Sequence, residues 1–429
     1  MRVFLSAGEP SGDHHAALLI RSLRARHPGV ECVGLGGPQM AAEGCHLVAD
    51  LTRLAVMWFL RVIVSIHSFV DLARRAERSF LDRRPDVCVL IDFPGFHWWL
   101  AWRAKRHGIP VVFYCPPQIW AWASWRKAKM RRLVDHVLSP LPFEHEWFNE
   151  QGIVSTLVGH PFFDEHAPGA SAGTFSRPAP RDAAQEGPLV LLLPGSRGQE
   201  ISANLPTLIH AADLVRQRVP GARFVVAVLH ERHADTVRSM LGGMTSRRSE
   251  LASIDIVPGR ARSLMQEASC AIAVSGSVSL ELLSARIPAV IVYRISGFAF
   301  VVQSWLRHAR FITLVNLMAV RAPILPLQRT LAVPTSVAPA DPEAVYPEYL
   351  AVGDPAERAA GHVVEWLIDE RARERVVERL DEIASRVAAP GSAMKAAAAV
   401  LAIAAGADPA IAVRGEEAKS GPTAAVRAA

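Results

Sequence analysis

A glycine-containing turn in the second half of the chain carries the clearest chemistry. Gly195, Ser196 and Arg197 follow the apolar segment 189–193 and precede a helical pattern. Amide groups at the start of a helix, a hydroxyl and a guanidinium all favour an anionic ligand such as a diphosphate. An ordinary helix cap is the alternative interpretation of this turn taken alone.

A second turn of small residues occurs after the apolar segment 271–274. It contains Ser275, Gly276 and Ser277, and Glu281 follows one turn into the next helix. Small residues let a ligand approach the backbone, and a carboxylate at this place can hold the hydroxyl groups of a ribose. Two such turns in one half of the chain favour a nucleotide diphosphate site over two ordinary caps. We expect no metal and no other cofactor there, because a Walker lysine and an Asp-x-Asp pair are both missing.

An acidic turn ends the strongly apolar segment 87–91 of the first half. Asp92 comes directly after this segment, and His97 follows five residues later. In an open parallel sheet the C-terminal ends of the strands face the ligand, so Asp92 is a candidate general base. His97 is a candidate second proton-transfer or sugar-binding group. The alternative is a helix cap beside a hydrogen-bonded histidine; we favour the catalytic interpretation for Asp92 and the structural one for His97.

The N-terminal turn 6–13 combines glycines with polar side chains. Glu9, Ser11 and Asp13 lie where a strand gives way to a helix, a place that favours a ligand rich in hydroxyl groups, such as a sugar. The two carboxylates would repel a pyrophosphate, which argues against a dinucleotide site. A turn in which Asp13 caps its own helix is an equally good interpretation.

The segment 54–72 is predicted to form a helix with an apolar surface interrupted by one narrow polar stripe. Arginines follow it closely, and this combination suits a lipid interface or an acyl chain. A buried core helix is the alternative. The residues that we expect to contact lipid are Trp58, Phe59, Val62, Ile63 and Ile66.

Tryptophans are concentrated in the first half of the chain, where eight of the ten lie between residues 58 and 147. Trp120, Trp122 and Trp125 directly precede the basic segment 126–132. We interpret this mixture as lipid-facing, because tryptophan combines an apolar body with a polar edge. Ordinary core tryptophans beside a solvated helix face are the alternative. Nucleic acid is not an expected partner, because the pattern of a nucleic-acid-binding module is missing.

The elements that position these residues alternate between short apolar segments and longer helical patterns. This alternation predicts an α/β fold with two doubly wound parallel sheets. Strands are expected at 2–7, 31–35, 87–91, 110–114, 136–139, 155–158, 189–193, 223–229, 254–257, 271–274 and 289–292. The expected organisation is an N-terminal Rossmann-like domain over 1–165, a linker over 166–188, a second Rossmann-like domain over 189–354 with a surface insertion over 326–346, C-terminal helices over 355–405 that pack back on the N-terminal domain or a partner, and a disordered tail over 406–429.

Composition limits the class of protein. Half of the 429 residues are hydrophobic and 21% are charged, which excludes a mostly disordered chain. The net charge of +6 suits anionic partners without choosing among them. The five cysteines have neither disulfide-framework nor zinc-site spacing, and we find neither a signal-peptide pattern nor an apolar run of 18 residues. We therefore expect a cytosolic chain whose helices do not span a membrane.

Short motifs follow one another over residues 3–350: Ala7-Gly8-Glu9 with Ser11-Gly12-Asp13, Gly36-Gly37-Pro38 with Met40, Ala55-Val56-Met57, Asp92-Phe93-Pro94-Gly95-Phe96, Trp120-Ala121-Trp122, Leu141-Pro142-Phe143-Glu144, Val158-Gly159-His160-Pro161, Leu193-Pro194-Gly195-Ser196-Arg197, Ser275-Gly276-Ser277 with Leu280-Glu281, and Asn316 with Arg321. Any one of them could arise by chance. Their ordered set resembles the lipid-A-disaccharide synthases, a family of inverting glycosyltransferases that join two acylated glucosamines.

The resemblance implies a GT-B fold, two Rossmann-like domains facing a cleft. It implies metal-independent transfer of 2,3-diacylglucosamine from its UDP donor to the 6-hydroxyl of 2,3-diacylglucosamine 1-phosphate, with a β-1,6-linked product. Asp92 matches the family's general base and Arg197 an arginine needed for activity. Peripheral association with the cytoplasmic face of the inner membrane and a homodimer with exchanged C-terminal segments are implied as well. The residues matched to the UDP site are Gly195, Ser196, Arg197, Ser275, Gly276, Ser277, Glu281, Asn316 and Arg321.

The chain departs from the family pattern near the predicted acceptor and lipid-facing regions. Trp58 and Arg61 stand where the family usually has Gly and Glu, and Gly95 and His97 replace Asp and Asn. These departures leave acyl-chain length and acceptor identity open. Two other functions also stay open. One is another GT-B enzyme on UDP-sugars, such as a peptidoglycan-type glycosyltransferase or a UDP-N-acetylglucosamine 2-epimerase, and the other is an inactive membrane-bound UDP-sugar sensor.

Overall fold

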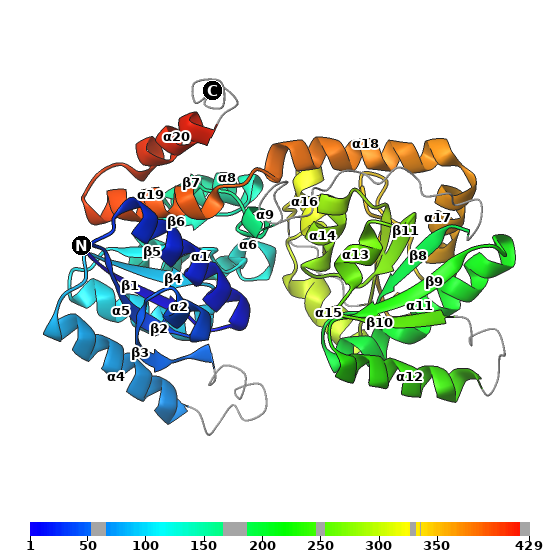
Figure 1. The fold of residues 1–429 in the computed structure, drawn as a ribbon, viewed down its shortest axis with the longest axis horizontal. Helices are drawn as coiled ribbons and strands as arrows, with labels where there is room; N and C mark the ends of the chain where they lie inside the picture. Colours follow the sequence, from blue (N-terminus) through cyan, green and yellow to red (C-terminus); the bar gives the residue numbers. More distant parts are fainter. Residues whose placement is uncertain (53–65, 166–186, 246–253, 327–331, 335, 421–429) are drawn as a thin grey trace. The chain divides into compact units, whose positions relative to one another are not determined.

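The chain divides into two compact units, each with its own parallel sheet and hydrophobic core (Figure 1). Unit 1 comprises Met1–Ala170 and Val387–Ala429, and unit 2 comprises Ser171–Arg386. The computed structural model describes residues 1–52, 66–165, 187–245, 254–326, 332–334 and 336–420.

Unit 1 contains a seven-stranded parallel sheet with the order β3-β2-β1-β4-β5-β6-β7. The order reverses between β1 and β4, and ligands of open α/β sheets bind beside such a point, at the C-terminal ends of the strands. The strands are β1 (Arg2–Ala7), β2 (Glu31–Gly36), β3 (His46–Asp50), β4 (Val87–Ile91), β5 (Val111–Tyr114), β6 (His136–Ser139) and β7 (Ser155–Leu157).

Helices cover both faces of this sheet, as its strands with apolar side chains on both sides require. Phe4 belongs to the core on one face and Leu5 to the core on the other, because side chains alternate along a strand. The Phe4 face packs against α4 (Ile66–Asp82), α5 (Pro94–Arg106), α7 (Lys127–Leu133) and α8 (Pro142–Glu150). The Leu5 face packs against α1 (Pro10–Arg26), α2 (Pro38–Ala42), α19 (Ser392–Ala404) and α20 (Pro409–Ser420).

Unit 2 contains a six-stranded parallel sheet with the order β10-β9-β8-β11-β12-β13, which reverses between β8 and β11. Its strands are β8 (Leu189–Leu193), β9 (Arg223–Val228), β10 (Ile254–Pro258), β11 (Cys270–Ala273), β12 (Ala289–Arg294) and β13 (Glu348–Ala351). Its helices are α11 (Gly198–Arg218), α12 (Glu231–Thr245), α13 (Ala261–Met265), α14 (Val278–Ala285), α15 (Gly297–Leu306), α16 (Leu314–Ala319), α17 (Ala356–Ile368) and α18 (Glu370–Val387). The α/β class with two doubly wound parallel sheets is therefore confirmed.

Two strands, β3 and β13, were not predicted from the sequence. Both lie at an edge of their sheet, where a strand has one neighbour and a weaker apolar pattern. β3 contains no fully buried residue, and β13 alternates buried and half-buried residues directly after a proline-rich segment.

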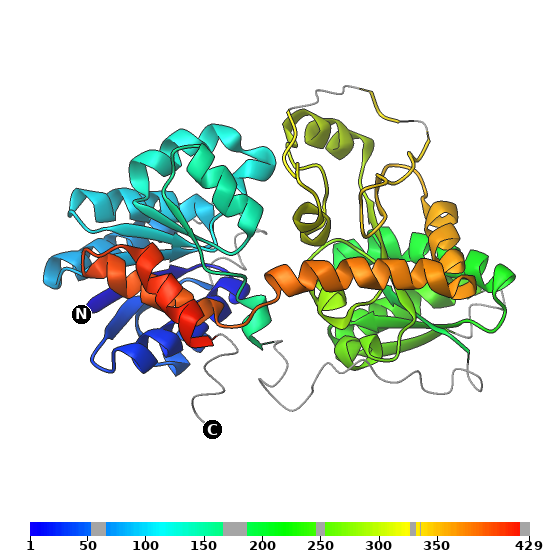
Figure 2. The same ribbon diagram turned by 90° about the horizontal axis from the view of Figure 1, so that it is seen from above.

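The helices after residue 355 divide between the two units. In unit 2, α17 packs against α11, whereas in unit 1 α19 packs against α1 (Figure 2). The start of α19 is held by α9 (Phe162–Glu165), whose Asp164 accepts hydrogen bonds from the backbone N–H groups of Gly391, Ser392 and Ala393 at 2.7–2.8 Å. The expectation that all these helices pack back on the N-terminal half does not describe α17.

The predicted disordered tail is wrong for residues 409–420, which form α20. Val413 is buried in the core of unit 1, and Lys395 of α19 forms an ion pair with Glu417 at 2.9 Å. Glu416 forms a second ion pair, with Arg26 of α1. These partners lie far away in the sequence, so the composition of the tail did not reveal them.

Among the described residues, one stretch, Glu370–Ala404, is long and apolar enough to cross a membrane by length and composition. It consists of two helices, α18 and α19, separated by Gly391 at φ +95°. The alanines of α19 are buried against the sheet and α1, as in a core helix.

Candidate functional site

In unit 2, the two predicted turns follow neighbouring strands at the point where the sheet order reverses. Leu193 at the end of β8 is paired with Ala273 at the end of β11. The structure therefore places the turn of Gly195 and the turn of Ser275 side by side at the C-terminal edge of the sheet. This is the place where an open α/β sheet binds its ligand.

The first turn is a helix start whose N–H donors are satisfied by a carboxylate of the chain itself. The backbone N–H groups of Ser196 and Arg197 donate to Oε2 of Glu200 at 3.2 and 3.3 Å, and the Arg197 guanidinium reaches Oε1 at 2.9 Å. The Arg197 side chain is otherwise 76% exposed. Gly195 has φ +117°, and a Cβ there would lie 2.9 Å from Cβ of Glu200. Glu200 was missed by sequence reasoning, although its spacing from Arg197 follows the capping-box pattern.

The second turn is held by two side-chain hydrogen bonds, and it has open space beside Gly276. The Ser275 hydroxyl donates to the carbonyl oxygen of Ile312 at 3.0 Å, and the buried Ser279 hydroxyl donates to the carbonyl oxygen of Gly276 at 2.9 Å. The space beside the Cα atom of Gly276 is open. Ser277 occupies the N-cap position of α14, and burial raises the pKa of Glu281.

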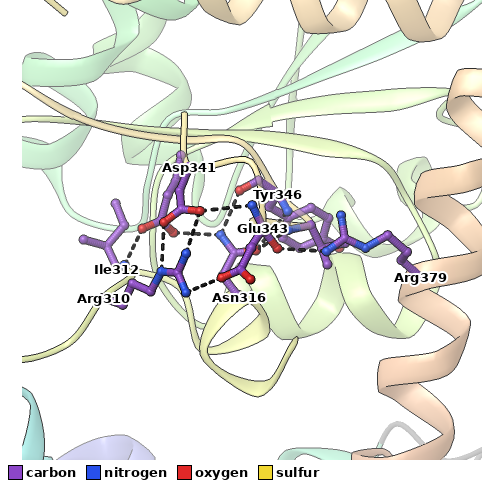
Figure 3. A network of polar contacts seen from close by, with 9 residues as sticks. Arg310, Ile312, Asn316, Asp341, Glu343, Tyr346 and Arg379 are labelled. Carbon is purple, nitrogen blue, oxygen red and sulfur yellow. Dashed lines mark hydrogen bonds and ion pairs between the residues drawn. The ribbon is translucent and has the colours of Figure 1, made fainter. Parts of the chain in front are cut away.

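Asn316 lies inside unit 2 and is not placed to touch a nucleotide. Its Nδ2 donates to the carbonyl oxygen of Tyr346 at 2.8 Å and to Oε2 of Glu348 at 3.0 Å. Its Oδ1 accepts from the N–H groups of Val345 and Tyr346 at 3.0 and 2.9 Å (Figure 3). The amide is fully buried and its hydrogen-bonding capacity is used, so Asn316 positions the backbone around it. This differs from the predicted contact with UDP.

The same network corrects the predicted surface insertion over 326–346, because Val345 and Tyr346 at its end are buried. Arg310 binds the Asp341 carboxylate with two hydrogen bonds of 2.8 and 2.9 Å, as Figure 3 shows. The bonds hold this part of the segment against the unit.

Glu348 connects the network to the second turn. Its half-buried carboxylate accepts from the N–H groups of Ile312 and Thr313 at 2.6 and 3.2 Å and from the Thr313 hydroxyl at 2.9 Å. Burial raises its pKa. Since Ser275 donates to Ile312, this carboxylate fixes the backbone that supports the second turn.

Arg321, the last of the residues predicted for the UDP site, is exposed.

In unit 1, Asp92 stands at the corresponding point of reversal. Ala7 at the end of β1 is paired with Ile91 at the end of β4, and Asp92 follows. Asp92 and Phe93 adopt φ +54° and +49°, a left-handed conformation that costs residues other than glycine roughly 1–2 kcal/mol each. Such strain is concentrated at functional sites. Burial raises the pKa of Asp92, which brings the carboxyl nearer to the range of a general base at neutral pH.

His97 holds the Asp92 turn instead of facing a substrate. Its Nδ1 lies 2.5 Å from the carbonyl oxygen of Asp92 and its Nε2 lies 2.9 Å from the Ser6 hydroxyl. The ring has no exposed surface, and burial lowers its pKa to about 4, so it is neutral at pH 7. The structural interpretation describes His97 better than a direct sugar contact.

Asp13 also has a structural role, although not as the cap of its own helix. Its buried carboxylate accepts from the N–H groups of Gly37, Gln39 and Met40 at 2.8, 3.0 and 3.2 Å, and so holds the start of α2. The N-cap of α1 is Glu9, which is half-buried, and Ser11 beside it is exposed.

Two residues near Asp92 were not predicted as site residues. Cys115 follows β5, the neighbour of β4, and has φ +49°. Glu144 is buried, accepts a hydrogen bond from Nε1 of Trp120 at 2.8 Å, and has a pKa raised to about 8 by burial. Burial also raises the pKa of Cys115, and the negative charges of Glu144 and Asp92 raise it further. Only the motif Leu141–Glu144 gave a sequence signal for Glu144.

The other predicted residues cannot be placed in full. Trp58, Phe59, Val62 and Ile63 lie outside the described residues, and Ile66 is the first residue of α4. Within the described part of the chain, His, Cys, Asp and Glu form no group of three or more that could hold a metal ion.

Both units thus have Rossmann-like parallel sheets whose strand order reverses at the centre, and two such units in one chain define the GT-B fold. Among solved structures, the chain is similar to a UDP-N-acetylglucosamine 2-epimerase of Listeria monocytogenes (TM-score 0.58, 10% identity, 95% of this chain and 98% of that one). It is also similar to the Neisseria meningitidis epimerase bound to UDP-GlcNAc (TM-score 0.55, 12% identity, 94% and 99%). At this identity these likenesses show the fold alone.

Sequence relatives define the family. Residues 3–328 match the model of the lipid-A-disaccharide synthetase family. The chain is 34% identical over 318 residues to the lipid-A-disaccharide synthase of Trichlorobacter lovleyi, covering 74% of this chain and 81% of that protein. It is 35% identical over 321 residues to that of Pseudomonas putida, covering 74% and 83%. The chain belongs to the lipid-A-disaccharide synthase family and is a glycosyltransferase.

Proposed function

We propose that the protein transfers 2,3-diacylglucosamine from its UDP donor to the 6-hydroxyl of 2,3-diacylglucosamine 1-phosphate. The products are a β-1,6-linked disaccharide 1-phosphate and UDP. The observation that carries the proposal is the strained, half-buried Asp92 at the point of reversal in unit 1, in a chain whose unit 2 presents N–H donors and a guanidinium at its own point of reversal. Family membership supplies the substrate class.

Unit 2 binds the donor in this proposal. The N–H groups of Ser196 and Arg197 and the Arg197 guanidinium pass from Glu200 to the diphosphate oxygens, and Gly276 lets the nucleotide approach the backbone. Glu281 binds the ribose hydroxyls. As the bond from C1 to the diphosphate breaks, negative charge develops on UDP, and these donors stabilise it without rearranging.

Unit 1 activates the acceptor. Asp92 takes the proton of the 6-hydroxyl while the oxygen attacks C1 of the donor from the face opposite the diphosphate. The electron pair of the broken bond leaves with UDP, and C1 is inverted. His97 keeps the Asp92 turn in place through its bond to the Asp92 carbonyl oxygen. Glu9 and Ser11, at the adjacent end of β1, bind acceptor hydroxyls.

The enzyme works at the cytoplasmic face of the inner membrane as a peripheral protein, since both substrates are amphiphiles. The apolar segment around Trp58 to Ile66 receives acyl chains or the membrane interface. Two copies form a dimer in which α19 and α20 exchange, replacing the packing of α19 on α1 within one chain.

The test is UDP release from UDP-2,3-diacylglucosamine in mixed micelles, with and without 2,3-diacylglucosamine 1-phosphate. The proposal expects release that requires the acceptor and yields a disaccharide. Release without the acceptor would instead indicate a hydrolase or an epimerase-like route. Bound UDP without any release would indicate a sensor.

A further inference from the structure

A surface hollow between α5 and α7 of unit 1 combines tryptophans with cations. It has a volume of about 400 Å³ and is lined by Trp98, Trp99, Trp102, Arg103, Lys129, Arg132 and Leu133. Trp98 is buried at its floor, whereas Trp99 and Trp102 are 46% and 44% exposed. Side chains this large and apolar are seldom left this exposed without a partner, and a volume of this size is within the range of ligand sites.

Among the described residues, one of the three cations that line the hollow has an ion-pair partner and two have none. Arg103 is paired with Glu77 at 3.0 Å. Within the part of the chain that the structure describes, neither Lys129 nor Arg132 forms an ion pair, and Arg106 and Arg126 beside them form none either. Burial lowers the pKa of Lys129, and the nearby Arg126 and Arg132 lower it further. A half-buried lysine among arginines is a place where an anion would be stabilised.

The cations also lie against the faces of the rings. Lys129 Nζ lies 5.3 Å from the ring centre of Trp98, and Arg106 lies over Trp102 at 4.8 Å. Continuing along the chain, Arg126 lies over Trp122 at 5.2 Å. Tryptophan with arginine or lysine is the pairing found where proteins meet the headgroup layer of a bilayer.

We propose that this hollow is a docking site for the phosphate headgroups of an anionic bilayer, with Lys129 and Arg132 binding phosphate and Trp99 and Trp102 entering the interface. This deepens the proposed function and rests on its claim that the enzyme works on membrane lipids. α5 begins two residues after Asp92, and Trp99 lies five residues further along this helix, about 7.5 Å from its start at 1.5 Å per residue. Docking here would hold the acceptor-activating turn near the lipid surface.

The test is sedimentation of the full chain with vesicles of phosphatidylcholine, with and without phosphatidylglycerol. The wild type is expected to bind the anionic vesicles. The double variant Lys129→Gln/Arg132→Gln is expected to bind them about tenfold or more weakly, since a cation near such a surface contributes on the order of a fivefold preference. The matched control Arg371→Gln/Arg375→Gln removes two exposed cations from α18 and should bind like the wild type.

Three results would overturn the proposal. They are equal vesicle binding by the double variant and the wild type, equal loss in the control, and self-association in light scattering that Trp99→Ala/Trp102→Ala abolishes without affecting vesicle binding. UDP binding, measured by calorimetry without lipid, separates this proposal from the proposed function. Loss of vesicle binding in Lys129→Gln/Arg132→Gln with unchanged UDP affinity supports the docking site. If the wild type and this variant bind vesicles as expected but the wild type does not bind UDP, only the proposed function is contradicted.

Discussion

Units 1 and 2 share a strand order around the point of reversal, but their central strands lead into opposite kinds of turn. In unit 2 the turn after β8 contains Gly195 at φ +117° and directs two N–H groups and a guanidinium at the Glu200 carboxylate. In unit 1 the turn after β4 contains Asp92 and Phe93, which adopt positive φ without being glycine. Glycine adopts such a conformation at little cost, whereas Asp92 must be held by its surroundings. The same sheet topology therefore positions hydrogen-bond donors in unit 2 and a carboxylate in unit 1.

The largest effect is expected at the acid of unit 1. Asp92→Asn removes the proton acceptor while keeping the size of the side chain, so kcat should fall roughly 10²–10⁴-fold. Steady-state kinetics with both lipid substrates measure this, and circular dichroism checks the fold. A folded variant with wild-type turnover would contradict the assignment of the general base to unit 1.

A second large effect concerns the stability of unit 1 at the start of α2. Asp13→Ala leaves three N–H groups of α2 without their acceptor, and unfolding should become easier by about 2–4 kcal/mol. Urea titration of the variant measures this loss. The exposed neighbour Ser11→Ala serves as the control and should change stability by less than about 0.5 kcal/mol.

The pH dependence of stability offers a sharper test of the buried acids in unit 1. The pKa of Glu144 is raised by burial from 4.5 to about 8, so the folded chain keeps a proton that the unfolded chain releases. The resulting stabilisation is present below pH 4.5 and is lost as pH rises through about 8. Glu144→Gln keeps an acceptor for Trp120 and cannot ionise, so it should gain about 3–4 kcal/mol over the wild type between pH 5 and pH 8. Parallel pH profiles of the two proteins would contradict this.

A smaller effect is expected at the glycine of unit 2. Gly195→Ala forces a Cβ to within 2.9 Å of Cβ of Glu200 at a strained φ, and UDP binding should weaken by about 1–2 kcal/mol. Gly198→Ala, where a Cβ meets no atom within 4 Å, is the matched control for UDP titration. Equal affinities for the two variants would show that the conformation of Gly195 is not needed.

The parts of the fold that could be predicted are those with a local signal. The apolar runs of β4 and β8 and the small residues after them gave both the sheets and the placement of the two turns, because strand ends meet at one edge. Edge strands such as β3 gave no such signal.

The roles of individual polar residues depended on distant partners. Asp13 binds N–H groups 24–27 residues away, and Asn316 binds backbone 29 and 30 residues away. Neither spacing follows a helix or strand period, so both residues were predicted to face ligands when they hold the backbone instead. Glu200 lies only three or four residues from its partners in the sequence, so its capping-box spacing could have predicted these contacts.

The most direct test of the division of labour is UDP affinity measured side by side in Arg197→Ala and Asp92→Asn by calorimetry. Loss of a guanidinium that binds the diphosphate should weaken UDP binding by about 1.5–3 kcal/mol, whereas loss of the acid in unit 1 should leave it unchanged. Unchanged UDP affinity in Arg197→Ala, or an equal loss in both variants, would contradict the account.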